Sequence, residues 1–361
     1  MISKSEIEKK LEEYGGEIKI ATICSHSALQ IFHGAKLEGL QTIGITNSKS
    51  KPVYDAFPMS RPDKYIEIEQ YSDILKKEVQ EQLLEENAVV VPHGSFVEYV
   101  GAKNIENQLE VPMLGNRKVL EWESDREKER EWLKKAGCYV PKRFKKPSDI
   151  NGPCLVKFPG AKGGKGFFVA MDEDEFQRKI GDRKDYIIQE FIIGTRYYFH
   201  YFYTPLFKEG YKAGDGRLEM LSMDRRIESN IDELHRFGFT RKEMDKAKIQ
   251  RSFVVTGNLP LVLRESMLSK VMEMGKNVID TSKKLFEPGM LGPFCLETVC
   301  TPELDIYVFE ISARIVAGTN LYPLGSPYSQ YLFSESMSTG RRIAHEVKQA
   351  SRTGQLEKIV Y

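Results

Sequence analysis

The chain has 361 residues, 53 Lys and Arg against 52 Asp and Glu, and 41% hydrophobic residues. That length predicts two or three domains, because a single hydrophobic core stops growing at a smaller size. The balanced charge argues against a nucleic-acid partner, since such proteins carry a basic excess. No segment approaches the eighteen apolar residues that suggest a membrane span, so we expect a globular cytoplasmic protein.

The chain contains five cysteines and no CxxC pair, so we expect reduced thiols. They are Cys24, Cys138, Cys154, Cys295 and Cys300. Cys24 precedes a Ser-His pair and could be a nucleophile, but a free cysteine is more often a small buried apolar residue. We therefore leave Cys24 out of the predicted chemistry.

The first part of the chain alternates between strand and helix patterns. A charged amphipathic helix opens it; strands are expected over 17–24, 41–46 and the apolar run 88–96, and helices over 25–40 and 71–87. This alternation predicts a small parallel α/β domain. Ligands collect at the carboxyl ends of parallel strands, where Ser25–Ser27 and Pro92–Ser95 fall.

The remainder reads as a linker followed by α+β structure. Residues 121–145 form a connecting helical segment that a capping Ser124 begins and Gly137 ends. Strands are expected within 153–204, 294–300 and 306–312, with a long helix over 265–286, whereas 204–220 and 232–252 look like polar loops without an assigned role. We predict an N-terminal α/β domain over 1–120, a linker with an ATP-binding lid over 121–205, and a C-terminal subdomain over 206–361.

A glycine-rich loop lies between two strand patterns in KFPGAKGGKGFFVA. It contains Gly160, Lys162, Gly163, Gly164, Lys165 and Gly166. Glycine allows close approach of the backbone N–H groups to phosphate, and lysine adds positive charge. The loop lacks the Walker pattern, and an ordinary glycine-rich hairpin is the alternative reading.

Two carboxylates, Glu297 and Glu310, each lie in the middle of an apolar strand pattern. Burying an unpaired carboxylate is costly, and two on neighbouring strands repel each other unless a cation lies between them. Oxygen ligands of this kind suit Mg²⁺ that also binds substrate phosphates. The alternative is that each is a half-exposed strand residue or a partner of Arg314.

Together these features resemble the ATP-grasp fold, over roughly residues 120 to 345. The resemblance implies phosphate contacts from Lys157 and from the loop residues Lys162, Gly163, Gly164, Lys165 and Gly166. It implies an adenine-facing hinge at Gln189, Glu190, Phe191 and Ile192, and metal ligands at Glu297 and Glu310. One departure is Ser312, where many members carry a metal-binding Asn; Asn320 is a candidate substitute.

The whole chain resembles the narrower family of archaeal formate-dependent synthetases that formylate 5-aminoimidazole-4-carboxamide ribotide (AICAR). The stretches SHSALQI, VVPHGSF, TGNLP, GPFCLET and FEISARIVAGTN carry this resemblance. It implies ribotide contacts from His26, Ser95 and Asn258, an ATP contact from Glu228, and catalysis by His26, Lys157 and Lys162. It also implies ATP, formate and AICAR as small-molecule partners, Mg²⁺ or Mn²⁺ as cofactor, and a homo-oligomer.

Two rival functions remain open from sequence: a ligase of the same fold acting on another carboxylate and amine, and a non-catalytic nucleotide-binding protein. A dehydrogenase is disfavoured because GxGxxG is absent after the first strand. The alternative for His26 is a residue at the start of a helix, next to serines that could cap it. The alternative for His93 is a residue of the PHGS turn at a strand end, with no contact to a ligand. Arg117 and Arg314 are each either an anion contact or a salt-bridge residue.

Overall fold

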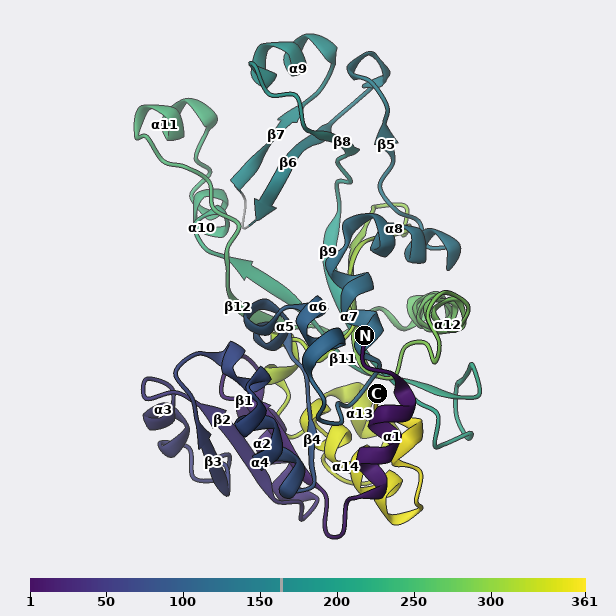
Figure 1. Ribbon diagram of the computed structural model, residues 1–361. Helices are drawn as coiled ribbons and strands as arrows, with labels where there is room; N and C mark the ends of the chain where they lie inside the picture. Colours follow the sequence, from purple (N-terminus) through teal and green to yellow (C-terminus); the bar gives the residue numbers. More distant parts are fainter. Residues whose placement is uncertain (163–164) are drawn as a thin grey trace.

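The computed structural model describes residues 1–162 and 165–361, and the side chains outside residues 159–165. Three sheets follow one another along the molecule: a four-stranded parallel sheet at one end, a six-stranded sheet in the middle and a small four-stranded sheet at the other end (Figure 1). This arrangement confirms the predicted combination of α/β and α+β structure.

The N-terminal sheet is parallel throughout, with strand order β3-β2-β1-β4. Its strands are β1 (Lys19–Ile23), β2 (Thr42–Thr46), β3 (Lys64–Glu67) and β4 (Ala88–Val90). The helices of this part are α1 (Lys4–Glu12), α2 (Ala28–Leu37), α3 (Lys51–Asp55), α4 (Lys77–Glu85), α5 (Gly94–Val100) and α6 (Ala102–Gln108). β2 and β4 are buried along their whole length, as expected for strands covered on both faces.

Two short helices, α7 (Arg117–Ser124) and α8 (Arg126–Lys135), connect this sheet to the small one. The small sheet has the order β5-β8-β6-β7 and consists of β5 (Arg143–Phe144), β6 (Cys154–Lys162), β7 (Lys165–Ala170) and β8 (Ile187–Glu190). Helix α9 (Glu173–Ile180) packs on it and buries Phe176 against β6 and β7 residues. The small sheet thus has a core of its own.

The middle sheet has the order β10-β11-β9-β13-β14, and β12 pairs with β11. Its strands are β9 (Thr195–Thr204), β10 (Lys212–Ala213), β11 (Gly216–Glu228), β12 (Val255–Pro260), β13 (Gly292–Cys300) and β14 (Ile306–Ser312). The remaining helices are α10 (Ile231–Arg236), α11 (Arg241–Lys246), α12 (Leu268–Leu285), α13 (Pro327–Leu332) and α14 (Thr339–Arg352). Helix α12 buries Val271, Val278 and Ile279 at helical spacing, and they join the largest core cluster.

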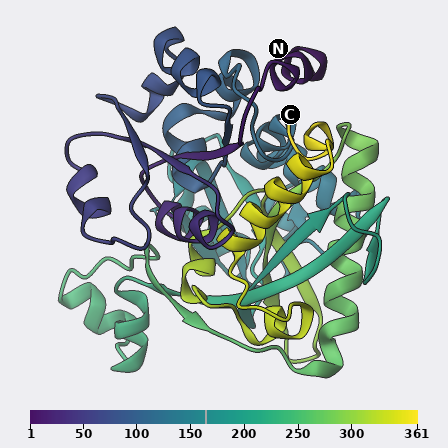
Figure 2. The same cartoon turned by 90° about the horizontal axis from the view of Figure 1, so that it is seen from below.

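The two ends of the chain pack together where α14 crosses α2, which Figure 2 shows in yellow and purple. A Cβ on Gly34 would meet the backbone nitrogen of Arg341 at 2.2 Å, and one on Gly340 would meet the carbonyl oxygen of Gln30 at 2.2 Å. Only glycine fits either position, because the clashing atoms belong to backbone. The Gln30 side chain completes the joint by accepting from the backbone N–H of Gly340 at 2.8 Å.

Several local expectations were wrong. The helix expected over 71–87 is a 3-10 turn over 71–75 followed by α4, because Lys76 between them has an extended backbone. The cap of α8 is Asp125, which accepts from the backbone N–H groups of Glu127 and Lys128, and Ser124 bonds instead to the carbonyl of Leu120. The polar stretches 204–220 and 232–252 contain β10, the start of β11, and helices α10 and α11.

Candidate active site

Glu297 and Glu310 are direct partners across the β13–β14 pair, at a register shift that follows Glu297. Glu297 is buried, whereas the side chain of Glu310 is 35% exposed. Burial, followed by the charge of Glu297, raises the pKa of Glu310. The structure therefore brings the two predicted metal ligands together as a repelling pair that favours binding of positive charge.

Each of these carboxylates is held by an arginine that sequence reasoning did not single out. Arg226 donates from Nη1 to Oε2 of Glu297 at 2.9 Å and from Nη2 to Oε1 at 2.7 Å. Arg126 lies 3.1 Å from Oε2 of Glu310 and also pairs with the buried Glu129. The alternative partner of these acids, Arg314, instead pairs with Glu123 at 2.9 Å.

Glu129 links the linker helix α8 to β14, the strand that carries Glu310. Its Oε1 accepts from the backbone N–H of Ile311 at 2.8 Å, and its Oε2 accepts from Arg126 at 3.1 Å. Burial and the nearby charge of Glu310 raise the pKa of Glu129 to about 8. Three carboxylates and two guanidinium groups thus gather where α8, β11, β13 and β14 meet.

The acidic pair fits a divalent cation of the Mg²⁺ type, since its donors are carboxylate oxygens on two rigid strands. In the described part of the chain, no group of three His, Cys, Asp or Glu residues could enclose a metal. Two protein carboxylates are also how Mg²⁺ is commonly bound alongside the phosphates of a substrate. Ser312, at the position of the missing Asn, donates to Oε1 of Glu297 at 3.1 Å.

Lys157 lies on β6 at the side of the small sheet that approaches this cluster. Its Nζ donates to Oε1 of Gln189 on β8 at 3.4 Å. Burial and then the charge of Arg126 lower the pKa of Lys157, and Glu310 and Glu129 act in the opposite direction. Lys157 and Gln189, both predicted at the nucleotide, are therefore neighbours near the acidic pair.

The rest of the predicted nucleotide-binding set is only partly described. Gly163 and Gly164 lie outside the described residues, as do the side chains of Lys162 and Lys165. Gly166 follows with a φ of 75°, in the left-handed region that favours glycine.

Beyond β8, the backbone N–H of Phe191 donates to the carbonyl of Pro153 at 2.9 Å, and that of Glu190 to the carbonyl of Lys142 at 2.8 Å. Ile192 is half-buried beside them. These contacts fix the segment that leads from the small sheet to β9. Glu228 ends β11 and pairs with Arg196 on β9.

On the other side of the cluster, the carboxyl edge of the N-terminal sheet brings His26, His93 and Ser95 together. The rings of His26 and His93 are stacked with centroids 5.3 Å apart and planes 3° apart. The Ser25 hydroxyl donates to that of Ser95 at 3.0 Å. Desolvation, followed by His93, Arg314 and Arg226, lowers the pKa of His26, so its imidazole is neutral near pH 7.

Asn258 reaches the same region from β12, where it lies opposite Arg226 in the β11–β12 pair. Its amide nitrogen donates to Oδ2 of Asp224 at 2.6 Å, and Oδ1 of Asp224 lies 2.8 Å from Nε2 of His200. This buried network orients the Asn258 amide. This network could not be predicted from the sequence, because His200, Asp224 and Asn258 come from three different strands, β9, β11 and β12.

Two further expectations need correction. Arg117 is not an anion contact: it is fully buried and donates to the carbonyl oxygens of Ile105, Leu109, Val111 and Tyr361. Asn320 contacts neither carboxylate among its described hydrogen bonds; it donates to the carbonyl of His26 at 3.3 Å and accepts from Gln30 at 2.9 Å. Asn320 therefore supports the histidine side of the site.

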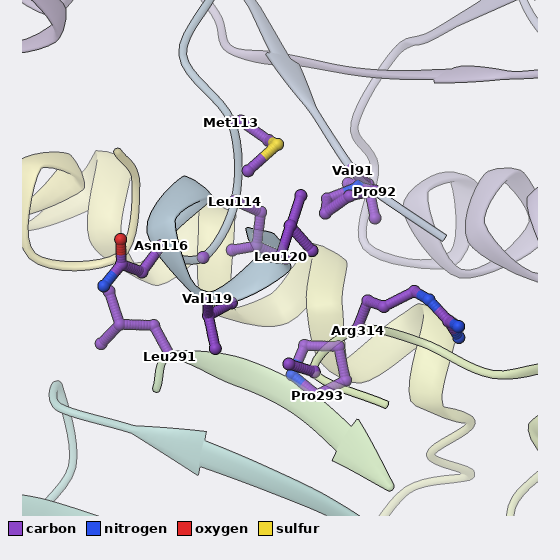
Figure 3. A pocket seen from close by; sticks show the side chains of 12 residues that line it. Val91, Pro92, Met113, Leu114, Asn116, Val119, Leu120, Leu291, Pro293 and Arg314 are labelled. Atoms are coloured by element: carbon purple, nitrogen blue, oxygen red, sulfur yellow. The ribbon is translucent and has the colours of Figure 1, made fainter. Parts of the chain in front are cut away.

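A small cavity of about 10 Å³ lies beside α7, which contributes Val119 and Leu120 to its lining (Figure 3). Apolar side chains such as Val119 and Leu291 line it, and Arg314 lies at its rim with the guanidinium directed away from Asn116. A space of this size holds at most about one water molecule, so it is not the substrate site. Among the described side chains, Nε of Arg314 is buried without a hydrogen-bond partner.

Two family models match most of the chain. Residues 20–144 match a family model described as "Protein of unknown function (DUF1246)", and residues 173–361 match "Domain of unknown function (DUF1297)". The IMP biosynthesis protein PurP from Thermococcus kodakaraensis superposes with a TM-score of 0.74 at 29% identity, over 95% of this chain and 100% of that one. The ADP complex of an N5-carboxyaminoimidazole ribonucleotide synthetase, at 14% identity, shares the fold with a TM-score of 0.62, over 92% of this chain and 76% of that one.

The fold and the site together define a member of the ATP-grasp superfamily, as the sequence predicted. A 5-formaminoimidazole-4-carboxamide-1-(beta)-D-ribofuranosyl 5'-monophosphate synthetase from Methanococcoides burtonii is 55% identical over 361 residues, covering 100% of both chains. The chain belongs to this family of synthetases, and its relative in Methanocaldococcus jannaschii is 44% identical, again over 100% of both chains.

Proposed function

We propose that the chain is an ATP-dependent ligase that formylates the amine of AICAR with formate, giving the 5-formamido ribotide of purine biosynthesis. The observation that carries this proposal is the meeting of two sets of groups at Arg226. On one side lie Glu297, Glu310 and Lys157, which suit Mg·ATP. On the other lie His26, Ser95 and Asn258, which suit a polar ribotide.

Formate does not react with an amine at neutral pH, because the leaving group would be oxide. Transfer of the γ-phosphoryl group of ATP to formate gives formyl phosphate, from which phosphate leaves readily. Lys157, Arg126 and Arg226 supply positive charge for this step, in which charge stabilisation is the main requirement. Glu297 and Glu310 would hold Mg²⁺ or Mn²⁺, which neutralises further charge on the phosphates.

The ribotide amine then attacks the formyl carbon, a C–N bond forms, the C–O bond to phosphate breaks, and the amine loses a proton. This amine is conjugated with its ring and weakly basic, so orientation matters more than deprotonation. Asn258, held by Asp224, presents its amide oxygen to a ligand donor, and neutral His26 offers a ring nitrogen. Ser95 and Arg314 add a hydroxyl and a positive charge for anionic groups of the ribotide.

The test is phosphate release from ATP with Mg²⁺, formate and AICAR, leaving out each substrate in turn. Turnover that needs all three, with the formylated ribotide as product, supports the proposal. ATP hydrolysis that is indifferent to formate and AICAR would keep the fold-level assignment and reject these substrates.

We also propose that the protein forms a homo-oligomer, which light scattering of the purified chain tests.

In the described ranges, 1–162 and 165–361, no helix is long and apolar enough to cross a bilayer.

A further inference from the structure

His26 has a backbone conformation that a residue other than glycine rarely adopts. Its φ is 54°, in the left-handed region, which costs on the order of 1 kcal/mol or more and persists only where the surroundings enforce it. The side-chain amide of Asn320 donates from Nδ2 to the carbonyl oxygen of His26 at 3.3 Å. Nδ1 of the His26 ring lies 2.8 Å from the Ser27 hydroxyl. The molecule thus holds the His26 backbone and one ring nitrogen in place.

The ring of His26 rests on a second imidazole whose protonation state the backbone determines. His93 is fully buried; its Nδ1 accepts from the backbone N–H of Phe96 at 3.3 Å, and its Nε2 lies 3.0 Å from the carbonyl oxygen of Ile23. Because Nδ1 must accept, the proton is on Nε2 and the ring is neutral. Burial lowers the pKa of His93 to about 4, in agreement with this tautomer.

The edge of the His26 ring that carries Nε2 lies against Gly94, and it fits there because residue 94 has no side chain. A Cβ built on Gly94 would lie 2.8 Å from Nε2 of His26 and 3.5 Å from Cζ of Arg314. The φ of Gly94 lies outside the left-handed region, and the residue is the first of α5, so the backbone does not require glycine here. The position of the His26 ring is therefore the structural reason for a glycine at residue 94.

We propose that His93 and Gly94 are positioning residues for His26: the neutral His93 ring stacks on the His26 ring, and Gly94 leaves the space that the Nε2 edge of the His26 ring occupies. This inference rests on the proposed function, in which His26 contacts the ribotide. It assigns the PHGS turn to the alignment of His26 rather than to ligand contact. Neither residue touches the reacting atoms in this proposal.

The first test is Gly94→Ala, with Gly15→Ala as control, since a Cβ on Gly15 meets no heavy atom within 4 Å. Alanine suits the first turn of a helix better than glycine, which offsets part of the cost of displacing the His26 ring, so the variant should still fold, as circular dichroism would show. We expect kcat/KM for the ribotide to fall by roughly 10- to 100-fold, as misplacement of a site group predicts. The Gly15→Ala variant should match the unchanged protein, and unchanged kcat/KM in Gly94→Ala would overturn the proposal.

The second test is His93→Gln, whose amide nitrogen can still donate to the Ile23 carbonyl while the ring platform is lost. The histidine NMR signals of the folded variant report the His26 ring directly, independently of turnover. We expect the His26 signals to move and the ribotide KM to rise more than kcat falls. If the His26 signals are unchanged, His93 does not position the His26 ring and the proposal is wrong. If the signals move but the unmodified protein does not turn over AICAR, the positioning role stands and only the proposed substrate is rejected.

Discussion

Arg226 reaches across an intervening strand to hold Glu297. Arg226 lies on β11 and Glu297 on β13, and the guanidinium passes over the ring of Tyr198 on β9 between them, 3.9 Å from the ring centroid. Both ends of the guanidinium are used, at 2.9 and 2.7 Å. The central acid of the site is therefore held by a planar two-point contact that a lysine could not reproduce.

Glu297→Gln should weaken metal binding and leave Arg226 without a charged partner. We expect the affinity for Mn²⁺, measured by electron paramagnetic resonance, to fall at least about 10-fold, and kcat to fall about 100-fold or more. The control is Glu303→Gln, on the exposed turn after β13. Equal Mn²⁺ affinity in the two variants would remove Glu297 from the metal site.

Asp224→Asn should release Asn258, because Oδ2 of Asp224 is the acceptor that orients its amide. We expect the KM for the ribotide to rise roughly 10-fold, since a lost hydrogen bond to a charged group is worth about 1.5–3 kcal/mol. The matched control is Asp215→Asn, an exposed residue that pairs with Lys283. A ribotide KM that stays at the starting value would show that Asn258 needs no such orientation.

Arg117→Met should destabilise the protein without a direct effect on chemistry. The buried guanidinium donates to four backbone carbonyl oxygens, which would lose their donors. We expect a loss of about 3–5 kcal/mol in the free energy of unfolding, measured with urea. Arg241→Met, on an exposed face of α11, should change it by less than about 0.5 kcal/mol, and the kcat of folded Arg117→Met should be retained.

The buried His93 should make the protein less stable in mild acid. Its pKa is lowered from 6.5 to about 4 in the folded state, so the unfolded chain binds a proton that the folded one does not. Its contribution is therefore fully present above about pH 6.5 and is lost progressively as the pH falls toward 4. Urea unfolding at pH 7.5 and 5 should show a drop that is smaller in His93→Gln, and an equal drop in both proteins would contradict this origin.

Cys24 should be inert toward alkylating agents. Its thiol is buried in a cluster with Ala28, Phe32 and Tyr54, and burial raises its pKa to about 12, so almost none is thiolate near neutral pH. We expect iodoacetamide to leave Cys24 unmodified in the folded protein at pH 8, as read by mass spectrometry. Cys24→Ala should retain ligase activity; loss of activity in a folded variant would return this thiol to the chemistry.

Some of the predicted site residues were visible in local sequence patterns. Glu297 and Glu310 stood out because a carboxylate in an apolar strand is costly, and the β13–β14 register confirms that they are partners. His26 follows a buried strand in a parallel sheet, but its predicted ribotide contact came mainly from the family resemblance. For the two acids, the signal was an exception to the surrounding apolar pattern.

The groups that neutralise these acids could not be predicted, because they depend on strand order. Arg226 lies in a stretch of mixed polarity, and its link to Glu297 arises only when β9 lies between β11 and β13. Arg314, close to Glu310 along the chain, was the natural candidate from sequence, yet it turns toward Glu123 on α7. Proximity in the sequence therefore pointed to Arg314 as the partner of the two acids, whereas Arg226 and Arg126 are their partners.

The crossing of α2 and α14 has a consequence for engineering this family. Gly34 and Gly340 lie so close to the backbone of the opposite helix that no larger residue fits at either position, so the two helix surfaces match each other closely. An exchange of the N-terminal sheet between relatives would therefore have to transfer α14 with it, although about 300 residues of sequence separate Gly34 from Gly340 (340 minus 34 is 306). Chimeras cut after the first sheet would join mismatched helix surfaces, whereas chimeras that carry both segments would keep the joint next to His26 intact.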